Sequence, residues 1–375
     1  MTNYKEAIRR LNNKTPFFVF DRKQLEENYH RYLKELPSNT EICYAMKANS
    51  EKEVLQTLNS IGSSFEVASK YELALLKPIK VDASKILYGT SVKPVEHIKY
   101  FVKYGVSRFA FDSEHELEKL ALYAPGSKVY VRALVDDRAN SVFHMSEKFG
   151  TQLKNAVELM RKAKILGLLP YGISFNVGSQ ARNKDGWARG IKDVVSILKV
   201  LESDGIKVEM INFGGGFPFS YQPADAIPSI EEIGASIRSS VLTVPYPLKF
   251  IAEPGRGLVA NAFVLVTSVI ERSVRSNGEW LYIDAGVYNA LFEAMAFQGR
   301  TQYKVIPLLE HPNIELQNYI LTGPTGDNID IVNKAIQLPV DLALGEKLVI
   351  SDVGAYTFTL TTKFNGFPTP RTTQL

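Results

Sequence analysis

The stretch ICYAMKANSEKEVLQTLNSI, residues 42–61, decides the fold. It opens on a short apolar run, Ile42–Met46, of the kind that forms a strand buried on both faces. It closes on Glu51–Ile61, where apolar residues recur at the spacing of an amphipathic helix. A buried strand followed by a helix is the repeating unit of a parallel sheet, so this stretch predicts an α/β fold.

The same unit recurs along most of the chain. Further strand candidates are Phe65–Ala68, Ile86–Tyr88, Phe109–Phe111, Val129–Leu134, Gly172–Val177, Met210–Phe213 and Phe250–Ala252. Stretches of helical period lie between them: Tyr71–Leu76, Val95–Tyr104, Glu114–Tyr123, Leu153–Leu166, Gly190–Glu202 and Ile230–Val241. Buried strands separated by helices in this number predict a closed (β/α)8 TIM barrel, a fold of ~250 residues, with a doubly wound open sheet as the alternative.

The rhythm changes after Gly257. Strand-like runs then follow one another without long helices between most of them: Ala262–Ile270, Trp280–Asp284, Thr301–Leu308, Tyr319–Thr322, Lys347–Ser351 and Thr357–Thr362. Such a series predicts a second, mostly antiparallel β domain, to which the early run Phe17–Phe20 is a candidate strand. We therefore expect a barrel over residues 23–257 and a β domain over residues 1–22 and 258–375.

Composition excludes several classes of function. The 375 residues carry 44 basic and 40 acidic side chains, a net charge of +4, without a dense basic run, so nucleic-acid binding is not expected. The single cysteine, Cys43, and five scattered histidines exclude a disulfide framework and predict no metal site. No apolar run has the ~18–20 residues of a membrane helix, and residues 1–6 do not resemble a secretory signal. We therefore expect a cytoplasmic protein without a membrane anchor.

A lysine, Lys47, directly follows the first strand candidate. Active sites of barrels lie at the carboxyl ends of the strands, where a lysine is partly desolvated and its neutral amine is favoured. A neutral lysine can condense with an aldehyde to form a Schiff base. The alternative is a strand-end lysine whose charged tip simply extends into water.

Three loops with glycine or small residues follow other strand candidates. Gly214–Gly216 and Gly255–Arg256 come after the seventh and eighth, where barrels often bind phosphate, and Gly178–Gln180 comes after the sixth. Backbone N–H groups of such loops can approach an anion closely, and Glu253 could accept a hydrogen bond from a ring nitrogen. Taken singly, each loop could also be an ordinary turn, and the loop with Gly255–Arg256 could be a surface turn with an ion pair. Together, a Schiff-base lysine, a phosphate cradle and a carboxylate describe a site for pyridoxal 5'-phosphate.

From about Pro16 to Pro368 the chain resembles the fold type III (alanine-racemase-type) pyridoxal-phosphate enzymes, among them the ornithine, arginine and diaminopimelate decarboxylases. The resemblance is greatest to the ornithine/lysine decarboxylase branch. It rests on Tyr44–Asn49, Phe65–Ser69, Asn176–Ser179, Gly214–Pro218, Glu253–Arg256, Gly323–Thr325 with Asp327, Asp352–Tyr356 and Phe364–Phe367.

The resemblance implies a role for each matching residue. Lys47 would hold the cofactor covalently, and Glu253 would pair with its ring nitrogen and keep it protonated. The other residues implied in cofactor binding are Glu66, Arg132, Asn176, Ser179, Gly215, Gly216, Gly255, Arg256 and Tyr356. Phe364 would line the pocket of the leaving carboxylate, and Asp327 would reach in from a second subunit, since this family shares its sites across a homodimer. The segment Arg138–Gly150 resembles a mobile loop that closes near the site.

Three departures from the family pattern bear on the substrate. Asn176 stands where the family usually has a histidine that stacks on the cofactor, and an amide stacks less well. Gly326 replaces the cysteine that protonates the substrate carbon, so that proton must come from water, Lys47 or another group. Phe297 falls, in an alignment without gaps, on the aspartate that binds the distal amine of ornithine. The space at Gly326 and the lost carboxylate suggest a substrate other than free ornithine, larger or already conjugated.

The sequence therefore predicts a pyridoxal-phosphate-dependent decarboxylase that converts an ornithine- or lysine-like, or a conjugated, amino acid to its amine. Racemisation and decarboxylation-coupled oxidation are alternatives in the same site, because Gly326 removes the usual proton donor. A non-catalytic, decarboxylase-like regulatory protein and a metabolite-binding barrel without a cofactor are two more, because fold alone does not fix function. The sequence leaves open the substrate and the choice between polyamine synthesis and a natural-product pathway.

Overall fold

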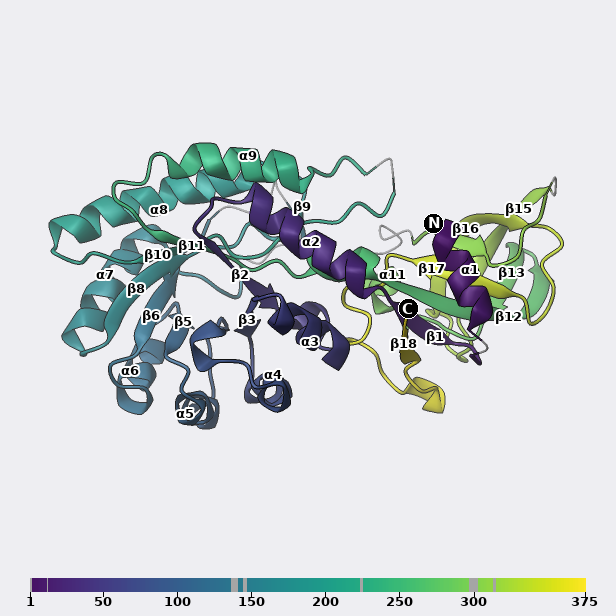
Figure 1. The fold of residues 1–375 in the computed structure, drawn as a ribbon, viewed down its shortest axis with the longest axis horizontal. Coiled ribbons are helices and arrows are strands. Elements are labelled where there is room, and N and C mark those ends of the chain that lie inside the picture. The colour runs from purple at the N-terminus through teal and green to yellow at the C-terminus, as the bar shows by residue number, and fades with distance from the viewer. Residues whose placement is uncertain are drawn as a thin grey trace. The chain divides into compact units, whose positions relative to one another are not determined.

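The structure is a computed structural model that describes residues 2–11, 13–135, 141–143, 147–222, 225–296, 303–312 and 315–375 (Figure 1). The chain forms two compact units. The barrel unit comprises Glu26–Phe219 and Ala226–Gly257, and the β unit comprises Met1–Leu25, Ser220–Asp225 and Leu258–Leu375. The predicted boundaries put residues 220–225 in the barrel, whereas in the structure Tyr221 of this segment packs edge-on against Tyr303, with ring centroids 5.8 Å apart.

The barrel unit is a closed ring of parallel strands. In ring order these are β2 (Thr40–Ala45), β3 (Ser64–Val67), β4 (Ile86–Tyr88), β5 (Arg108–Phe111), β6 (Lys128–Arg132), β8 (Leu169–Ser174), β10 (Met210–Asn212) and β11 (Lys249–Ala252). Pairing of β11 with β2, in which Ile251 lies opposite Glu41, closes the ring. The predicted TIM barrel is confirmed, and the open-sheet alternative is wrong.

Side chains fill the inside of the ring. The buried residues that pack there are Cys43, Leu87, Ala110, Tyr130, Tyr171, Met210 and Ile251. Gly172 of β8 has no room for a side chain, since a Cβ would lie 2.6 Å from the Met210 carbonyl oxygen. Because the interior is packed, the chemistry of the barrel is confined to its rim.

Helices follow the barrel strands and cover the outside of the ring (Figure 1). Helix α2 (Arg22–Glu35) precedes β2, and the others are α3 (Lys52–Ser60), α4 (Lys70–Leu76), α5 (Val95–Tyr104), α6 (Glu114–Tyr123), α7 (Leu153–Ile165), α8 (Gly186–Ser203) and α9 (Ile230–Val241). The side chains of Ser69, Ser113 and Ser229 cap the starts of α4, α6 and α9. Helices α5, α6 and α9 begin and end where the sequence predicts.

The β unit contains a mostly antiparallel sheet. Its strands follow in the order β14 (Val305–Pro307), β17 (Lys347–Ser351), β12 (Phe263–Arg275), β13 (Gly278–Ile283), β15 (Leu316–Thr322) and β16 (Ile331–Pro339). Strand β1 (Phe17–Phe20) pairs with β12 and with β18 (Arg371–Gln374), so the early strand belongs to this unit as predicted. Helix α1 (Thr2–Arg10) buries Ile8 in the cluster formed by Phe17, Val19, Val266, Leu308 and Val349.

One predicted strand is wrong, and β16 and β18 of the β unit are missing from the prediction. Thr357–Thr362 is not a strand, because Tyr356 before it has a left-handed φ of 58° and Thr357 Oγ1 donates back to the Val353 carbonyl oxygen at 2.5 Å. Strand β16 is missing because Asn333 and Lys334 interrupt its apolar alternation. The remaining short elements are β7 (Ser141–Phe143), which pairs with β9 (Ser179–Ala181), and helices α10 (Arg256–Val259) and α11 (Phe292–Ala296).

Candidate functional site

Four charged side chains predicted from the sequence lie at the carboxyl ends of barrel strands. Lys47 is in a 3-10 turn directly after β2, Glu66 lies in β3, Arg132 ends β6, and Glu253 follows β11. Glu253 interacts electrostatically with the other three, so the structure brings them together. A lysine, an arginine and two carboxyl groups therefore share one part of the barrel rim.

The turn that carries Lys47 is fixed by hydrogen bonds on both sides. The Tyr44 hydroxyl donates to the Asn49 carbonyl oxygen at 2.8 Å, and the Ala45 N–H donates to the Pro254 carbonyl oxygen at 3.1 Å. Met46 and Ala48 are buried, whereas Lys47 is exposed. The backbone thus holds the lysine in place while its amine stays accessible at the rim.

The carboxyl group of Glu253 is held by Asn212, the last residue of β10. Asn212 Nδ2 donates to Glu253 Oε1 at 2.5 Å, while Asn212 Oδ1 accepts the Gly214 N–H at 2.8 Å. Burial and the nearby Glu66 carboxylate raise the pKa of Glu253 to about 7, against the opposing effects of Asn212 and Lys47. A fixed carboxyl group that titrates near neutral pH suits the binding of a nitrogen base.

A third carboxyl group, Glu72 of α4, joins the site without having been singled out by the sequence. Its Oε2 accepts the Ala68 N–H at 2.7 Å. Burial and the charge of Glu66 raise the pKa of Glu72 to about 7, and Lys47 lowers it. In the sequence, the spacing Ser69-x-x-Glu72 is typical of a helix N-terminus. That spacing explains Glu72 as a capping residue, so it gives no sign that the carboxyl group lies at the rim.

Glu66 is 5% exposed and depends on a glycine beside it. A Cβ on Gly89 would lie 2.3 Å from Glu66 Oε1, so a larger residue at position 89 would displace the carboxyl group. Gly89 comes directly after β4, as the rim glycines of other loops follow their strands. Its place directly after a strand was the sign in the sequence that Gly89 belongs to the rim.

The glycine-rich loops after the seventh and eighth barrel strands form a close-packed cradle. Gly214 and Gly216 have φ values of +66° and +90°, and a Cβ on Gly216 would lie 2.3 Å from the Gly178 carbonyl oxygen. A Cβ on Gly215 would lie 2.9 Å from the Glu253 carbonyl oxygen, and one on Gly255 would lie 2.9 Å from Ala48 Cβ. Only glycine allows the chain to approach its neighbours this closely, as it must in a loop whose backbone N–H groups bind an anion.

These features fit pyridoxal phosphate. The cradle suits its phosphate, the exposed Lys47 suits its aldehyde, and the carboxyl group of Glu253 suits its ring nitrogen. Arg256, at the start of α10, is buried to 4% exposure beside the cradle loop that contains Gly255. Ser179 is half-buried at the start of β9.

Asn176, which stands where the family has a histidine, has its side chain bonded to the backbone of its own loop. Its Oδ1 accepts the Gly178 N–H at 2.9 Å, so the side chain shapes the loop that leads to Ser179. On the neighbouring strand β6, the guanidinium carbon of Arg132 lies 5.3 Å from the ring centroid of Phe149. Asn176 and Arg132 thus both lie in the barrel unit, at the carboxyl ends of its strands.

The remaining predicted residues of the described chain lie in the β unit. The Tyr288 hydroxyl donates to Asp327 Oδ2 at 2.8 Å, and the rings of Tyr288 and Phe364 stack with centroids 4.4 Å apart. The Ile329 N–H and the Tyr288 hydroxyl lower the pKa of Asp327. Tyr356 keeps its left-handed φ after Gly354, where a Cβ would lie 1.9 Å from the Val259 carbonyl oxygen.

Two predictions fall on residues that the structure does not describe. Phe297, the residue expected in place of a substrate-binding aspartate, lies outside the described residues. So do residues 138–140 and 144–146 of the expected loop Arg138–Gly150. The described part of that loop includes β7, which pairs antiparallel with β9, Phe143 lying opposite Ser179.

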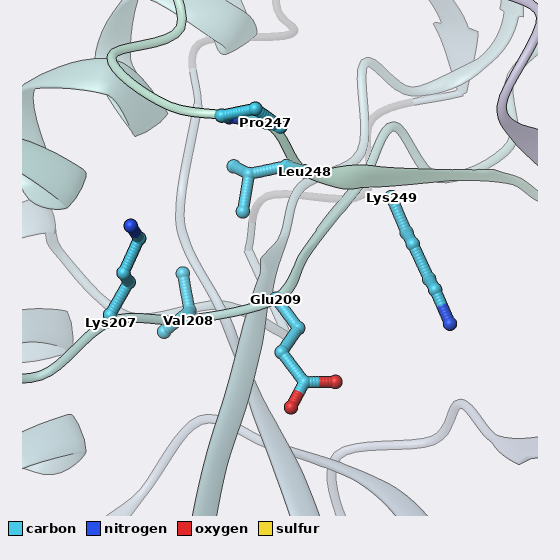
Figure 2. Close-up of a pocket in the computed structure, with 6 residues that line it drawn as sticks. All are labelled: Lys207, Val208, Glu209, Pro247, Leu248 and Lys249. Atoms are coloured by element: carbon cyan, nitrogen blue, oxygen red, sulfur yellow. The ribbon is translucent and has the colours of Figure 1, made fainter.

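A surface hollow lies at the opposite end of two barrel strands (Figure 2). It is lined by Lys207, Val208 and Glu209, which precede β10, and by Pro247, Leu248 and Lys249 at the start of β11. The active sites of such barrels lie at the carboxyl ends of the strands. This hollow at the amino ends is therefore separate from the candidate site.

Within the described ranges, no helix is both long and apolar enough to cross a bilayer. In the same part of the chain, no group of three or more histidine, cysteine, aspartate or glutamate side chains is arranged to hold a metal ion.

Residues 22–260 match the family described as "Pyridoxal-dependent decarboxylase, pyridoxal binding domain". Antizyme inhibitor 2 of Xenopus laevis is 33% identical over 367 residues, which cover 94% of this chain and 79% of the relative. Ornithine decarboxylase of Mus musculus is 31% identical over 376 residues, which cover 96% of this chain and 80% of the enzyme. The crystal structure of the Paramecium bursaria Chlorella virus arginine decarboxylase bound to agmatine has a TM-score of 0.91, 26% identity and 100% coverage of both chains.

Proposed function

Because this chain belongs to the pyridoxal-dependent decarboxylases, in the branch of the ornithine and lysine enzymes, we propose that its substrate is an α-amino acid with a larger side chain than free ornithine. A diamino acid already conjugated through its distal amine is the class that fits best. The reaction is the pyridoxal-phosphate-dependent decarboxylation of an amino acid, which makes the protein a carbon–carbon lyase.

The observation that carries the proposal is the open space beside Gly326. Of the described atoms outside its chain neighbours, only Asn365 Oδ1 lies within 4 Å of a Cβ built there, at 3.9 Å. The Gly326 N–H donates to the same oxygen at 3.1 Å, so this hydrogen bond holds the loop although position 326 itself has no side chain. Where the family pattern has a cysteine, this chain itself contributes no side chain, which suits a substrate with additional atoms.

The acidic groups for a distal amine support the same substrate class. Asp327 keeps its carboxylate, but one oxygen already accepts the Tyr288 hydroxyl and the other accepts the Ile329 N–H. Phe297 takes the place of the second aspartate in the ungapped alignment, and a phenylalanine cannot neutralise an ammonium group. A substrate whose distal amine is acylated carries no positive charge at this end, so it does not need a second carboxylate there.

The residues that would hold the cofactor come from both ends of the chain. Lys47 would bind its aldehyde carbon, and Glu253 would hold its ring nitrogen in the protonated form. The phosphate would be bound by Ser179, Gly215, Gly216, Gly255, Arg256 and Tyr356, and Glu66 and Arg132 would complete the site. When bound, pyridoxal phosphate withdraws electrons from the α-carbon of the substrate and so favours loss of the carboxylate.

The protein's own part in the reaction is to hold and move protons. Lys47 must be neutral to bind an aldehyde and takes up a proton when it is released. Glu72 and Glu253 both interact with Lys47, and both have a pKa of about 7. Each can therefore hold or release a proton beside Lys47 at neutral pH. With Gly326 in place of the cysteine, Lys47, Glu72 and water are the candidate proton donors to the α-carbon, while Glu253 is engaged at the ring nitrogen.

We further propose that the complete site is shared by two subunits of a homodimer. The support is the family's arrangement, in which the residue matching Asp327 reaches in from the second subunit. In this chain the Tyr288 ring, stacked on Phe364 and hydrogen-bonded to Asp327, holds these two side chains as one group.

A screen for released carbon dioxide tests the substrate. Wild-type protein loaded with pyridoxal phosphate is supplied with ornithine, lysine, arginine, diaminopimelate and diamino acids acylated on the distal amine. We expect kcat/KM to be at least about tenfold higher for an acylated diamino acid than for the free one. Gly326→Cys, which the surroundings admit, should reduce that preference. A wild type that prefers free ornithine would contradict the proposal.

A regulatory role is the second candidate, favoured by the 33% identity to antizyme inhibitor 2 of Xenopus laevis. A regulator that binds partners has no need of Lys47 or of the cradle glycines, which argues for catalysis. The same screen separates the two: no carbon dioxide from any amino acid in the presence of pyridoxal phosphate would favour regulation.

A further inference from the structure

One side chain joins the loop after β8, which carries Ser179, to the glycine loop after β10. Gln180, in β9, donates from Nε2 to the Phe219 carbonyl oxygen at 2.6 Å. Its Oε1 accepts the Phe219 N–H at 3.0 Å. A single primary amide thus binds both backbone groups of one residue on the other loop, which fixes the direction of that loop as well as its distance.

Gln180 is held in an unusual conformation. Its φ is +57°, in the left-handed region that residues other than glycine seldom adopt, and it is only 5% exposed. Such a conformation persists where the surroundings hold the residue, and it is enriched at binding sites. Both oxygen and nitrogen of its buried amide are satisfied by Phe219, so the side chain itself supplies part of that hold.

The two loops are also in direct backbone contact. The Ala181 N–H donates to the Gly216 carbonyl oxygen at 3.0 Å, and Gly216 approaches Gly178 so closely that a Cβ would lie 2.3 Å from its carbonyl oxygen. Ser179 therefore lies between two points of attachment to the glycine loop. The amide of Gln180 sets how the Ser179 loop is placed against Gly214–Gly216.

We propose that Gln180 is a positioning residue for the phosphate group of the cofactor. It makes no contact with that group itself, and it acts by keeping Ser179 and the glycine loop at the separation that a phosphate requires. This inference rests on the proposed assignment of these two loops to phosphate binding. It predicts that loss of the amide weakens the binding of a ligand only when that ligand carries a phosphate.

Two variants separate the amide from the backbone conformation. Gln180→Gly removes the amide and suits the left-handed φ, so the loop loses its attachment but gains no strain. Gln180→Asn keeps an amide and also tolerates this conformation, but its side chain is one methylene too short to reach both groups of Phe219. Thermal unfolding of the cofactor-free proteins verifies that each variant is folded.

The experiment titrates cofactor-free full-length protein with pyridoxal phosphate and, separately, with pyridoxal, which lacks the phosphate. Binding is followed by fluorescence, since Trp187 stacks on Phe217 of the glycine loop with ring centroids 4.9 Å apart. We expect both variants to bind pyridoxal phosphate about tenfold more weakly than wild type, and pyridoxal within about twofold of wild type.

Two results would overturn the inference. The first is unchanged affinity for pyridoxal phosphate in both variants. The second is an equal loss of affinity for the two ligands, which indicates a general loss of structure. A wild type that binds neither ligand would instead contradict the assignment of the cofactor site, so the two failures are distinguishable.

Discussion

At the scale of single residues, three carboxyl groups crowd one lysine at the barrel rim. Burial, together with the charge of the nearby Glu66, raises the pKa of Glu72 and of Glu253 to about 7. Carboxyl groups that repel each other in this way share protons instead of all being ionised. This part of the rim therefore favours the binding of positive charge. A protonated ring nitrogen carries such a charge, and so does the protonated amine of Lys47.

Substitution of Glu253 tests its role at the ring nitrogen. Glu253→Gln keeps an oxygen for the Asn212 amide but removes the negative charge. We expect kcat for decarboxylation to fall about 100-fold, because the charge that stabilises the protonated ring is lost. Steady-state kinetics at saturating pyridoxal phosphate measure it, and a kcat within about twofold of wild type would count against this role.

The raised pKa of Glu72 predicts a dependence of stability on pH. Below the ordinary value of 4.5 this carboxyl group is neutral in the folded and unfolded states, whereas between 4.5 and about 7 the folded state binds the proton more tightly. Its contribution is therefore fully present at low pH and is lost as the pH rises through about 7. For the cofactor-free protein we expect a loss of up to ~3 kcal/mol between about pH 5 and pH 8.

Urea unfolding of Glu72→Gln at both pH values measures this contribution. The variant should lose less stability than wild type on going to the higher pH, since glutamine does not ionise. Glu202→Gln, on the exposed side of α8, is the matched control and should behave as wild type. If Glu72→Gln shows the full pH dependence of wild type, the raised pKa of Glu72 is wrong.

At the scale of elements, the cradle depends on loops that follow strands. The seventh and eighth barrel strands end in Asn212 and Ala252, and the loops that follow come together through glycines that admit no Cβ. These loops were predictable, because glycines after buried strands are visible in the sequence. Their contacts with one another were not, since those depend on the closed ring.

A substitution in the cradle tests its function. Gly216→Ala introduces a Cβ 2.3 Å from the Gly178 carbonyl oxygen at a φ of +90°. We expect affinity for pyridoxal phosphate, measured by titration, to fall at least about tenfold because the loops must separate. Gly205→Ala is the control: its φ is +69°, but nothing lies within 4 Å.

The control separates strain from contact. Both substitutions carry about 1 kcal/mol of left-handed strain, and only Gly216→Ala disturbs the cradle. Equal affinity for the cofactor in the two variants would therefore contradict the assignment of this loop.

Some residues of the candidate site could be found from the sequence, and others could not. Lys47, Glu66 and Glu253 could be found because each lies at a strand end in a recognisable motif. Glu72 could not, because its position in the first turn of a helix is equally well explained by capping. Gln180 was visible only as a neighbour of Ser179, because its partner Phe219 is distant in the sequence and a left-handed φ leaves no mark on the residue type.

At the scale of the whole molecule, the predicted site residues are divided between the two units. Lys47, Glu253 and the cradle belong to the barrel unit, whereas Asp327 and Phe364 belong to the β unit. The proposed homodimer with shared sites would supply Asp327 from the partner subunit. Symmetric exchange of this kind gives two equivalent sites per dimer.

Mixing of inactive variants tests the shared site. Lys47→Ala and Asp327→Ala should each be nearly inactive alone, and each damages a different half of the site. When they are co-expressed, half of the dimers are mixed and each mixed dimer has one intact site, so about one quarter of wild-type activity should return. Activity no higher than that of the separate variants would show that each subunit builds its own site.

The measurement that tests the central claim most directly is carbon dioxide release from a distally acylated diamino acid, by wild type and Lys47→Ala side by side, each with pyridoxal phosphate. We predict that wild type releases carbon dioxide in step with formation of the amine, and that Lys47→Ala releases none above background. Release by both proteins, or by neither with any amino acid of the screen, would contradict decarboxylation at this site.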